Sequence, residues 1–169
     1  LSDYGKGTCT AAVCAAVITA AHAQGVPVVV DPKGGDWGRY RGADYITPNL
    51  RELNEVQRAP AANEDSAVES AARYALRRFH IKAMVATRSE RGLSLIKPRS
   101  AVHIPTKAQE VFDVSGAGDT VIAVFALALA GGLAQADSAY LANVAAGVVV
   151  GKLGTYAVSR EELLTALER

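Results

Sequence analysis

The sequence contains few residues that could bind a metal ion or form a disulfide. Its 169 residues include two cysteines and three histidines, and none of these has the spacing of a zinc site. Cys9 and Cys14 lie in a stretch that we expect to be helical, where they point to different sides and cannot readily pair. We therefore predict that both thiols are small core residues in a reducing cytosol.

The chain also lacks an excess of charge of either sign. Its 18 basic and 17 acidic residues give a net charge of +1, which creates no general attraction for nucleic acid or anionic lipid. The longest apolar stretch, near Val121–Ala130, is too short to cross a bilayer, and no signal peptide is visible. We therefore expect a cytoplasmic protein without nucleic-acid or membrane partners, in which any phosphate recognition is local.

Apolar residues, by contrast, are abundant, at half of the sequence. This excludes a disordered chain, and the length suits one domain over residues 1–169 with a substantial core. Helical and strand patterns alternate, with a helix over Thr8–Ala23 and strands over Pro27–Asp31, Asp44–Thr47 and Ala83–Thr87. The alternation predicts an α/β fold with a doubly wound, mostly parallel sheet.

A glycine-rich turn over Ser115–Gly118 is the strongest functional signal. We predict that a short strand over Glu110–Val114 leads into this turn and that the helix through Val121–Ala130 follows it. Small residues let the backbone amides approach a ligand, and the helix N-terminus adds its positive dipole, so the turn suits an anion. Asp119 follows at once, and an acid beside a bound phosphate suggests a base that deprotonates an attacking hydroxyl.

The turn can also be compared with two nucleotide-binding motifs and with a purely structural turn. A dinucleotide fingerprint would have a third glycine at Val121, and a P-loop would have Gly-Lys-Ser/Thr in place of Gly118-Asp119-Thr120, so the turn matches neither motif. A purely structural interpretation stays open, in which the strand simply turns into a helix and Asp119 is an ordinary first-turn acid.

Two further groups that could bind a ligand follow predicted strands, a lysine and an Asn–Glu pair. Lys33 lies at the carboxyl end of the first strand, the edge where α/β sheets bind ligands, although a solvated turn explains it equally well. Asn49 and Glu52 lie three positions apart at the start of a helix. They suit a helix cap with its capping-box partner, or a polar pair that orients water around magnesium and phosphates.

These segments resemble the ribokinase-like (PfkB-type) carbohydrate kinases. Asp113–Thr120 is similar to the second signature of that family, and Asn49–Glu52 is similar to its N-x-x-E motif. The resemblance covers essentially the whole chain and is closer still to the kinases of bacterial ADP-heptose synthesis, which phosphorylate D-glycero-β-D-manno-heptose 7-phosphate at O1. The segments that carry this closer resemblance are Leu1–Gly7, Val30–Gly34, Tyr40–Ala43, Thr47–Asn49, Thr87–Gly92 and Phe112–Thr120.

The resemblance implies a three-layer ribokinase-like fold with a mostly parallel sheet, of which this chain is the C-terminal, nucleotide-binding part. The N-terminal half of such kinases, with most sugar contacts and the β lid, is not in the sequence, which also begins without a methionine. We therefore expect a piece of a longer protein, inactive by itself. Many relatives dimerise through the lid, so the resemblance is compatible with a homodimer of the full-length protein. The H-x-G-H motif of a fused nucleotidyltransferase is absent from this sequence.

The resemblance also implies roles for individual residues. Asp119 would be the catalytic base, and the amides of Gly116, Ala117 and Gly118 would hold the transferring γ-phosphoryl group of ATP. Asn49 and Glu52 would help to hold Mg²⁺, largely through water. The other expected ATP contacts are Lys33, Thr87, Ser89, Glu90 and Gly92 along the phosphates and ribose, and Asn143 and Gly147 near the adenine.

The sequence thus predicts ATP- and Mg²⁺-dependent phosphoryl transfer to a sugar phosphate in the bacterial cytoplasm. The expected reaction converts heptose 7-phosphate to the 1,7-bisphosphate in the synthesis of lipopolysaccharide core precursors. One alternative is a ribokinase-like kinase for another sugar, and another is a catalytically silent nucleotide-binding module. Asp119 distinguishes the last of these, because a silent module has no need of an acid beside its anion site.

Overall fold

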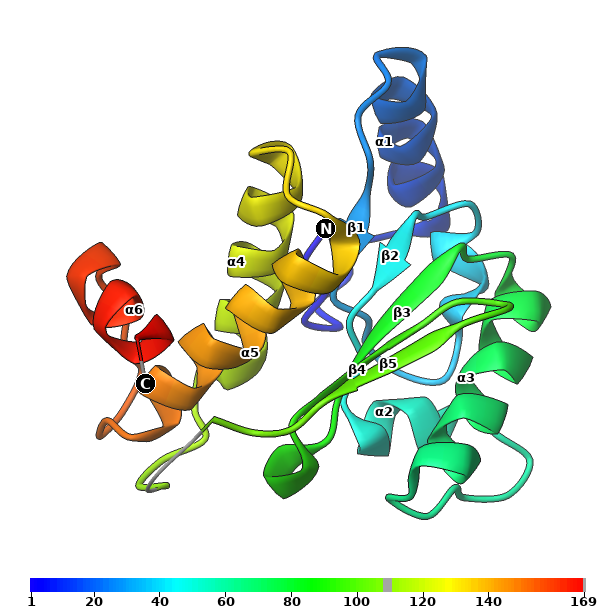
Figure 1. Cartoon of the computed structure of the whole chain (residues 1–169). Helices are drawn as coiled ribbons and strands as arrows, with labels where there is room; N and C mark the ends of the chain where they lie inside the picture. The colour runs from blue at the N-terminus through cyan, green and yellow to red at the C-terminus, as the bar shows by residue number, and fades with distance from the viewer. Residues whose placement is uncertain (108–110, 169) are drawn as a thin grey trace. The chain divides into compact units, whose positions relative to one another are not determined.

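The computed structural model describes residues 1–107 and 111–168 and contains a five-stranded sheet (Figure 1). The strands occur in the sheet in chain order: β1 Val29–Val30, β2 Tyr45–Ile46, β3 Ala83–Thr87, β4 Leu93–Ile96 and β5 Ala101–Ile104. The chain forms two compact units, Leu1–Arg88 with Ser94–Val102, and Ser89–Leu93 with His103–Arg169.

The first unit contains the parallel strands. Val29 is opposite Tyr45, and Tyr45 is in turn opposite Ala83. The helices of this unit are α1 Ala11–Ala23, η1 Trp37–Tyr40, α2 Leu50–Glu55 and α3 Asp65–Phe79. Both residues of β1 and both of β2 are buried, as expected for parallel strands covered on both faces. The α/β class with a mostly parallel sheet is therefore confirmed.

Helix α3 shows how strongly its sequence pattern determines its packing. Apolar residues recur along it at helical spacing and form one stripe, which is buried in full. The members of this stripe are Val68, Ala71, Ala72, Ala75, Leu76 and Phe79. Glu69 and Arg73, four positions apart on the same helix, form an ion pair at 2.7 Å. The helix ends where His80 adopts a left-handed conformation with φ 55°, and its last ring, Phe79, packs against Trp37 at 5.8 Å between centroids.

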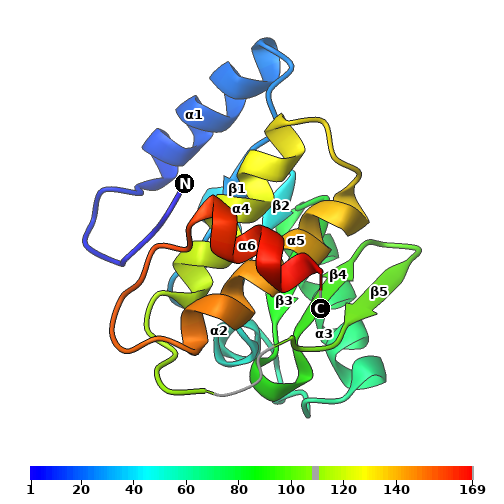
Figure 2. The same ribbon diagram turned by 60° about the vertical axis from the view of Figure 1, so that its left-hand side comes forward.

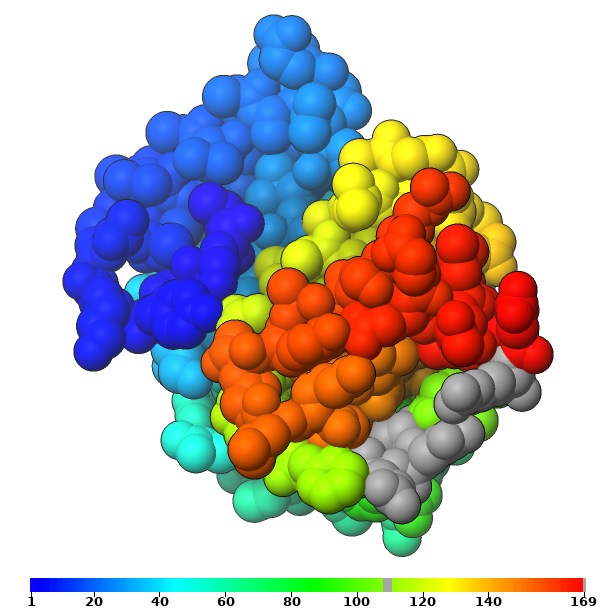
Figure 3. All heavy atoms as spheres, turned by 90° about the vertical axis from the view of Figure 1, so that its left-hand side faces the viewer, coloured from blue at the N-terminus to red at the C-terminus, as the bar shows by residue number. Residues whose placement is uncertain are grey.

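Helix α1 begins later than the sequence suggested. The Thr10 side chain accepts a hydrogen bond from the Val13 amide at 3.2 Å, so the helix starts at Ala11 and Cys9 lies outside it. Both cysteines are buried and free, as predicted. The chain before the helix lies beside β1, because Ser2 bridges Asp31 and the Asp3 amide donates to Asp31 O at 3.1 Å. Figure 3 shows this N-terminal segment in dark blue.

The Asp44 carboxylate connects to three other parts of the first unit. Its carboxylate accepts from His22 Nε2 at 2.8 Å, from the Val28 amide at 2.8 Å and from Lys82 Nζ at 2.6 Å. Burial by itself would raise the pKa of Asp44, but the hydrogen bonds from Lys82, Val28 and His22 outweigh it and lower the pKa below the usual 3.8. The cluster therefore stabilises the fold more when Asp44 is ionised than when it is protonated.

This cluster predicts a pH-dependent loss of stability. Because the folded pKa of Asp44 is lowered, its contribution is fully present above the unfolded pKa and is lost as pH falls through the folded value. At pH 7, Asp44→Asn should lower the free energy of unfolding by about 1–3 kcal/mol. Urea titrations at several pH values should show this difference shrinking below pH 3.8. A constant difference at every pH would contradict the role of the ionised carboxylate.

The second unit is built from helices α4 Ala117–Ala130, α5 Gln135–Val150 and α6 Arg160–Leu167. Helix α5 packs against both α4 and α6, as Figure 2 shows. A capping box begins α6, with Glu162 N donating to Ser159 Oγ at 3.2 Å and Ser159 N to Glu162 Oε2 at 3.0 Å. Within the described ranges, no helix is both long and apolar enough to cross a membrane.

The prediction of a strand before the glycine turn is wrong. Residues 111–114 form no strand, and Glu110 lies outside the described residues. The amides of Phe112 and Asp113 instead both donate to Val150 O, at 2.8 and 3.2 Å. A carbonyl at the end of α5 thus satisfies the backbone groups that a neighbouring strand would otherwise have bound.

Candidate functional site

Lys33, Asn49 and Glu52 meet in the first unit, at the carboxyl ends of β1 and β2. Lys33 Nζ donates to Glu52 Oε1 at 3.1 Å. Glu52 Oε2 accepts from the Asn49 amide at 3.0 Å, and Asn49 Oδ1 accepts from the Glu52 amide at 2.9 Å. The capping box that the sequence suggested for this pair is therefore present, and the same carboxylate also binds Lys33.

The exposure of these groups differs. The Glu52 side chain is 10% exposed, whereas that of Lys33 is 52% exposed. The hydrogen bond and the charge of Glu52 together raise the pKa of Lys33. The arrangement thus keeps a charged ammonium group at the surface, where it is hydrogen-bonded to a buried carboxylate.

Thr87 lies next to this group at the carboxyl end of β3. It forms a parallel bridge with Asn49, and its amide donates to Pro48 O at 3.0 Å. The ends of three consecutive parallel strands therefore bring together Lys33, Asn49, Glu52 and Thr87, as expected for ligand-binding positions in an α/β sheet.

Arg88 is a structural residue that the sequence did not identify. Polar residues follow β3 in the sequence, as in an exposed loop, but the Arg88 side chain is 1% exposed. Its guanidinium donates to Asn63 Oδ1 at 2.9 Å, to Asp65 Oδ1 at 2.6 Å and to Ser94 Oγ at 3.1 Å. A buried arginine held by such groups fixes the end of β3. Its partners lie 6 to 25 positions away, so no local pattern could have revealed them.

The residues after Arg88 that we predicted to contact the nucleotide belong to the second unit. Ser89 and Glu90 are exposed and lie in the short 3₁₀ helix η2, Ser89–Arg91. Ser89 has φ 53°, a conformation that residues with a side chain adopt only at a cost. Gly92 is buried with φ 78°, and the backbone of Ile104–Thr106 lies against it.

The glycine turn precedes α4 as predicted. Gly116 is the N-cap of that helix with φ 80°, and Asp119 lies exposed in the first turn. The Ala117 amide donates to Val114 O at 3.2 Å and is therefore already engaged. In the described part of the chain, the amides of Gly116 and Gly118 have no such acceptor, so they remain candidates for binding an anion.

Asp113 connects this turn to the loop after α5. Its carboxylate accepts from the Ser115 amide at 2.8 Å and from the Gly154 amide at 3.1 Å. The hydrogen bond from the Ser115 amide is the main reason why the pKa of Asp113 is lowered. Gly116 approaches the same loop, because a Cβ placed on it would lie 3.4 Å from Thr155 Cγ2.

Asn143 and Gly147 both lie on α5, one turn apart. Asn143 is buried, and its Nδ2 donates to Pro105 O at 2.8 Å. This bond gives the Asn143 side chain a structural partner in the second unit, and its approach to adenine stays a prediction.

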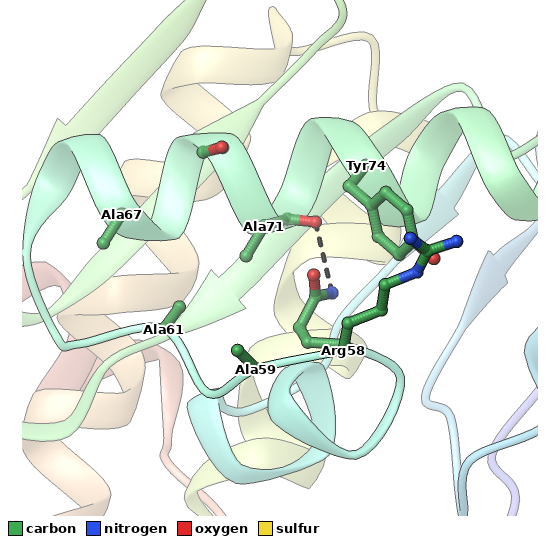
Figure 4. A pocket seen from close by; sticks show the side chains of 8 residues that line it. Arg58, Ala59, Ala61, Ala67, Ala71 and Tyr74 are labelled. Atoms are coloured by element: carbon green, nitrogen blue, oxygen red, sulfur yellow. Dashed lines mark hydrogen bonds between the residues drawn. The ribbon is translucent and has the colours of Figure 1, made fainter.

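A hollow of about 340 Å³ lies elsewhere in the first unit (Figure 4). Small apolar side chains form much of its wall, and none of the predicted site residues lines it. Its lining residues are Gln57, Arg58, Ala59, Ala61, Ala67, Ser70, Ala71 and Tyr74. Among the described residues there is also no group of three or more His, Cys, Asp or Glu side chains that could hold a metal ion directly.

Comparison with known proteins gives consistent matches. The chain is 52% identical over 168 residues to the bifunctional protein HldE of Gluconacetobacter diazotrophicus, covering 99% of this chain and 34% of that protein. It is 51% identical over 165 residues to HldE of Citrifermentans bemidjiense, covering 97% and 34%. The chain thus spans about a third of the length of these relatives.

A solved structure of Arabidopsis thaliana ribokinase, complexed with ribose and ATP, has the same fold. It superimposes with a TM-score of 0.83 at 23% identity, over 95% of this chain and 53% of that one. The ribokinase-like fold is therefore confirmed, and the chain corresponds to part of such a domain. The model of the pfkB family carbohydrate kinases matches residues 4–162. The chain therefore belongs to the pfkB family of carbohydrate kinases.

Proposed function

We propose that this chain is the nucleotide-binding, base-carrying part of a kinase that transfers the γ-phosphoryl group of ATP to O1 of heptose 7-phosphate. The observation that carries the proposal is the identity of 52% to an HldE protein over 99% of the chain. Family membership supports sugar kinase chemistry. The similarity to HldE proteins, together with the sequence resemblance to heptose kinases, favours the heptose over another sugar.

In this proposal, Glu52 and Asn49 hold Mg²⁺ through its water molecules. A carboxylate offers about four lone-pair sites, and Lys33 Nζ and the Asn49 amide occupy two of those of Glu52. Oxygen atoms that can still accept hydrogen bonds suit a hydrated magnesium ion, which gives up its water reluctantly. Mg²⁺ bound there would neutralise charge on the phosphate oxygens of ATP.

Asp119 is the proposed general base. Its place in the first turn of α4, three positions after the N-cap Gly116, would put it beside a phosphoryl group bound by the Gly116 and Gly118 amides. It would take the proton of the sugar O1 hydroxyl while these amides and the helix dipole stabilise the transferring group. Lys33, Thr87 and the Ser89–Gly92 loop would contact the rest of the nucleotide.

The substrate prediction requires the full-length protein that contains this chain. ATP consumption should be measured with a panel of sugar phosphates and free sugars. We expect kcat/KM for heptose 7-phosphate to exceed that for the other acceptors by at least about 100-fold, since hydrogen-bonding sites discriminate strongly among hydroxyl patterns. Preference for another acceptor would indicate a different kinase of this family, and ATP binding without consumption on any acceptor would indicate a silent module.

A further inference from the structure

A buried polar cluster of Asp3 and Tyr40 is hydrogen-bonded to the backbone of Lys33. The Tyr40 side chain is fully buried and Asp3 is 4% exposed. Tyr40 donates its hydroxyl hydrogen to Asp3 Oδ2 at 2.5 Å, and the same hydroxyl oxygen accepts from the Lys33 amide at 3.2 Å. One hydroxyl therefore joins the N-terminal segment to the residue that contacts Glu52.

Asp3 is held in place by several donors. Besides Tyr40, it accepts from the Gly5 amide at 2.7 Å and from Arg39 Nη1 at 3.3 Å. Burial would raise the pKa of Asp3, but these hydrogen bonds and the Arg39 charge lower it overall. The carboxylate is therefore ionised at neutral pH, and it orients the Tyr40 hydroxyl so that its oxygen faces the Lys33 amide.

Lys33 needs these hydrogen bonds because fixing the flexible chain around it costs conformational entropy. It opens the loop Lys33-Gly34-Gly35-Asp36, and fixing glycines and a long lysine side chain costs conformational entropy. Gly5 also borders the lysine side chain, since a Cβ placed on Gly5 would lie 3.5 Å from Lys33 Cγ. The N-terminal segment thus constrains both the backbone and the aliphatic part of Lys33.

We propose that Asp3 and Tyr40 are positioning residues that hold Lys33 for ATP binding. The inference rests on the role proposed above for Lys33, but it does not depend on which sugar is the acceptor. Tyr40 acts on ATP only through Lys33, so removing its hydroxyl should matter only while Lys33 is present. A tyrosine that merely stabilised the core would affect ATP binding independently of Lys33.

A double-mutant cycle on the full-length protein tests this, with the dissociation constant of MgATP measured by titration calorimetry. Lys33→Met should weaken binding about tenfold, the typical effect of losing a charge-assisted hydrogen bond. Tyr40→Phe keeps the buried ring and should weaken binding about fivefold, because Lys33 loses its fixed orientation. The double variant should be about tenfold weaker than wild type, whereas independent effects would multiply to about fiftyfold.

A matched control and a second variant complete the experiment. Tyr74→Phe removes another tyrosine hydroxyl, one that accepts from Arg78 Nη1 at 3.3 Å, and should leave MgATP binding unchanged. Asp3→Asn keeps one oxygen for Tyr40 and should give a smaller loss of affinity that also disappears when Lys33 is methionine. This variant carries the test if Tyr40→Phe fails to fold.

The outcomes separate this inference from the proposed function. Multiplicative effects, or unchanged binding in both Tyr40→Phe and Asp3→Asn, would overturn the positioning role while leaving the kinase assignment intact. Unchanged binding in Lys33→Met would overturn both the positioning role and the ATP contact of Lys33. A protein that phosphorylates no heptose would refute the proposed substrate, yet the cycle would still decide the roles of Asp3 and Tyr40, because it needs no acceptor.

Discussion

Asp119→Asn in the full-length protein should lower kcat by at least about a thousandfold, within the range expected for loss of a general base. Asparagine has nearly the shape of aspartate but cannot accept a proton from the acceptor hydroxyl. The affinity for ATP should stay the same or increase slightly, because the substitution removes a negative charge beside the proposed phosphate site. Single-turnover kinetics and MgATP titration on the same preparation would measure the two effects separately.

The control for this prediction is Asp137→Asn. Asp137 is exposed and lies in the first turn of α5, so this variant loses a comparable interaction with a helix dipole, worth about 0.3–1 kcal/mol. We expect it to retain wild-type turnover. If Asp119→Asn retained more than a tenth of the wild-type kcat, the base assignment would fail and Asp119 would be an ordinary first-turn acid.

Gly92→Ala should destabilise the protein more than the loss of the Asp44 carboxylate does. A Cβ on Gly92 would lie 2.2 Å from Ile104 O, 2.5 Å from Thr106 N and 2.6 Å from Pro105 C. All three are backbone atoms, so no side chain can rotate away, and φ is also +78°. Overpacking of about 1–3 kcal/mol and a left-handed penalty of about 1–2 kcal/mol together predict a loss of about 2–5 kcal/mol.

Gly132→Ala separates the two causes of that loss. Gly132 has φ +85°, but a Cβ there would meet nothing within 4 Å, so only the left-handed penalty of about 1–2 kcal/mol applies. Urea unfolding of both variants and the wild type would give the difference. Equal losses in the two variants would mean that the backbone around Gly92 moves aside easily, contrary to its close packing against Ile104–Thr106.

Some features of the fold and the site were predictable because they depend on neighbours in sequence. The buried stripe of α3 follows from the helical repeat of its apolar residues. The capping boxes at Asn49 and Ser159 each need residues only three positions apart. The glycine turn before α4 follows from small residues that precede an apolar helix. In each case the interacting atoms are within one or two turns of the chain.

Prediction failed where the partner of a group was distant. The segment before the glycine turn has the composition of a strand, yet Phe112 and Asp113 bind a carbonyl of α5. Arg88 has the sequence context of an exposed loop residue, yet hydrogen bonds to Asn63, Asp65 and Ser94 offset the cost of burying its charge. Such outcomes depend on which elements pack together, and this is not encoded in any short window of residues.

The sequence by itself determined the residue types of the candidate site: an acid after a glycine turn, a lysine after a buried strand, and the Asn49–Glu52 pair. It determined them because strands, turns and caps arise from local backbone preferences and side-chain spacing. Only the tertiary structure decided that Glu52 binds Lys33, 19 positions away, and that Asp3 reaches Tyr40 across 37 positions. The parallel strands bring Lys33 and Glu52 to one edge of the sheet. Because Glu52, Asp3 and Tyr40 are buried, their polar groups are stabilised by partners within the fold.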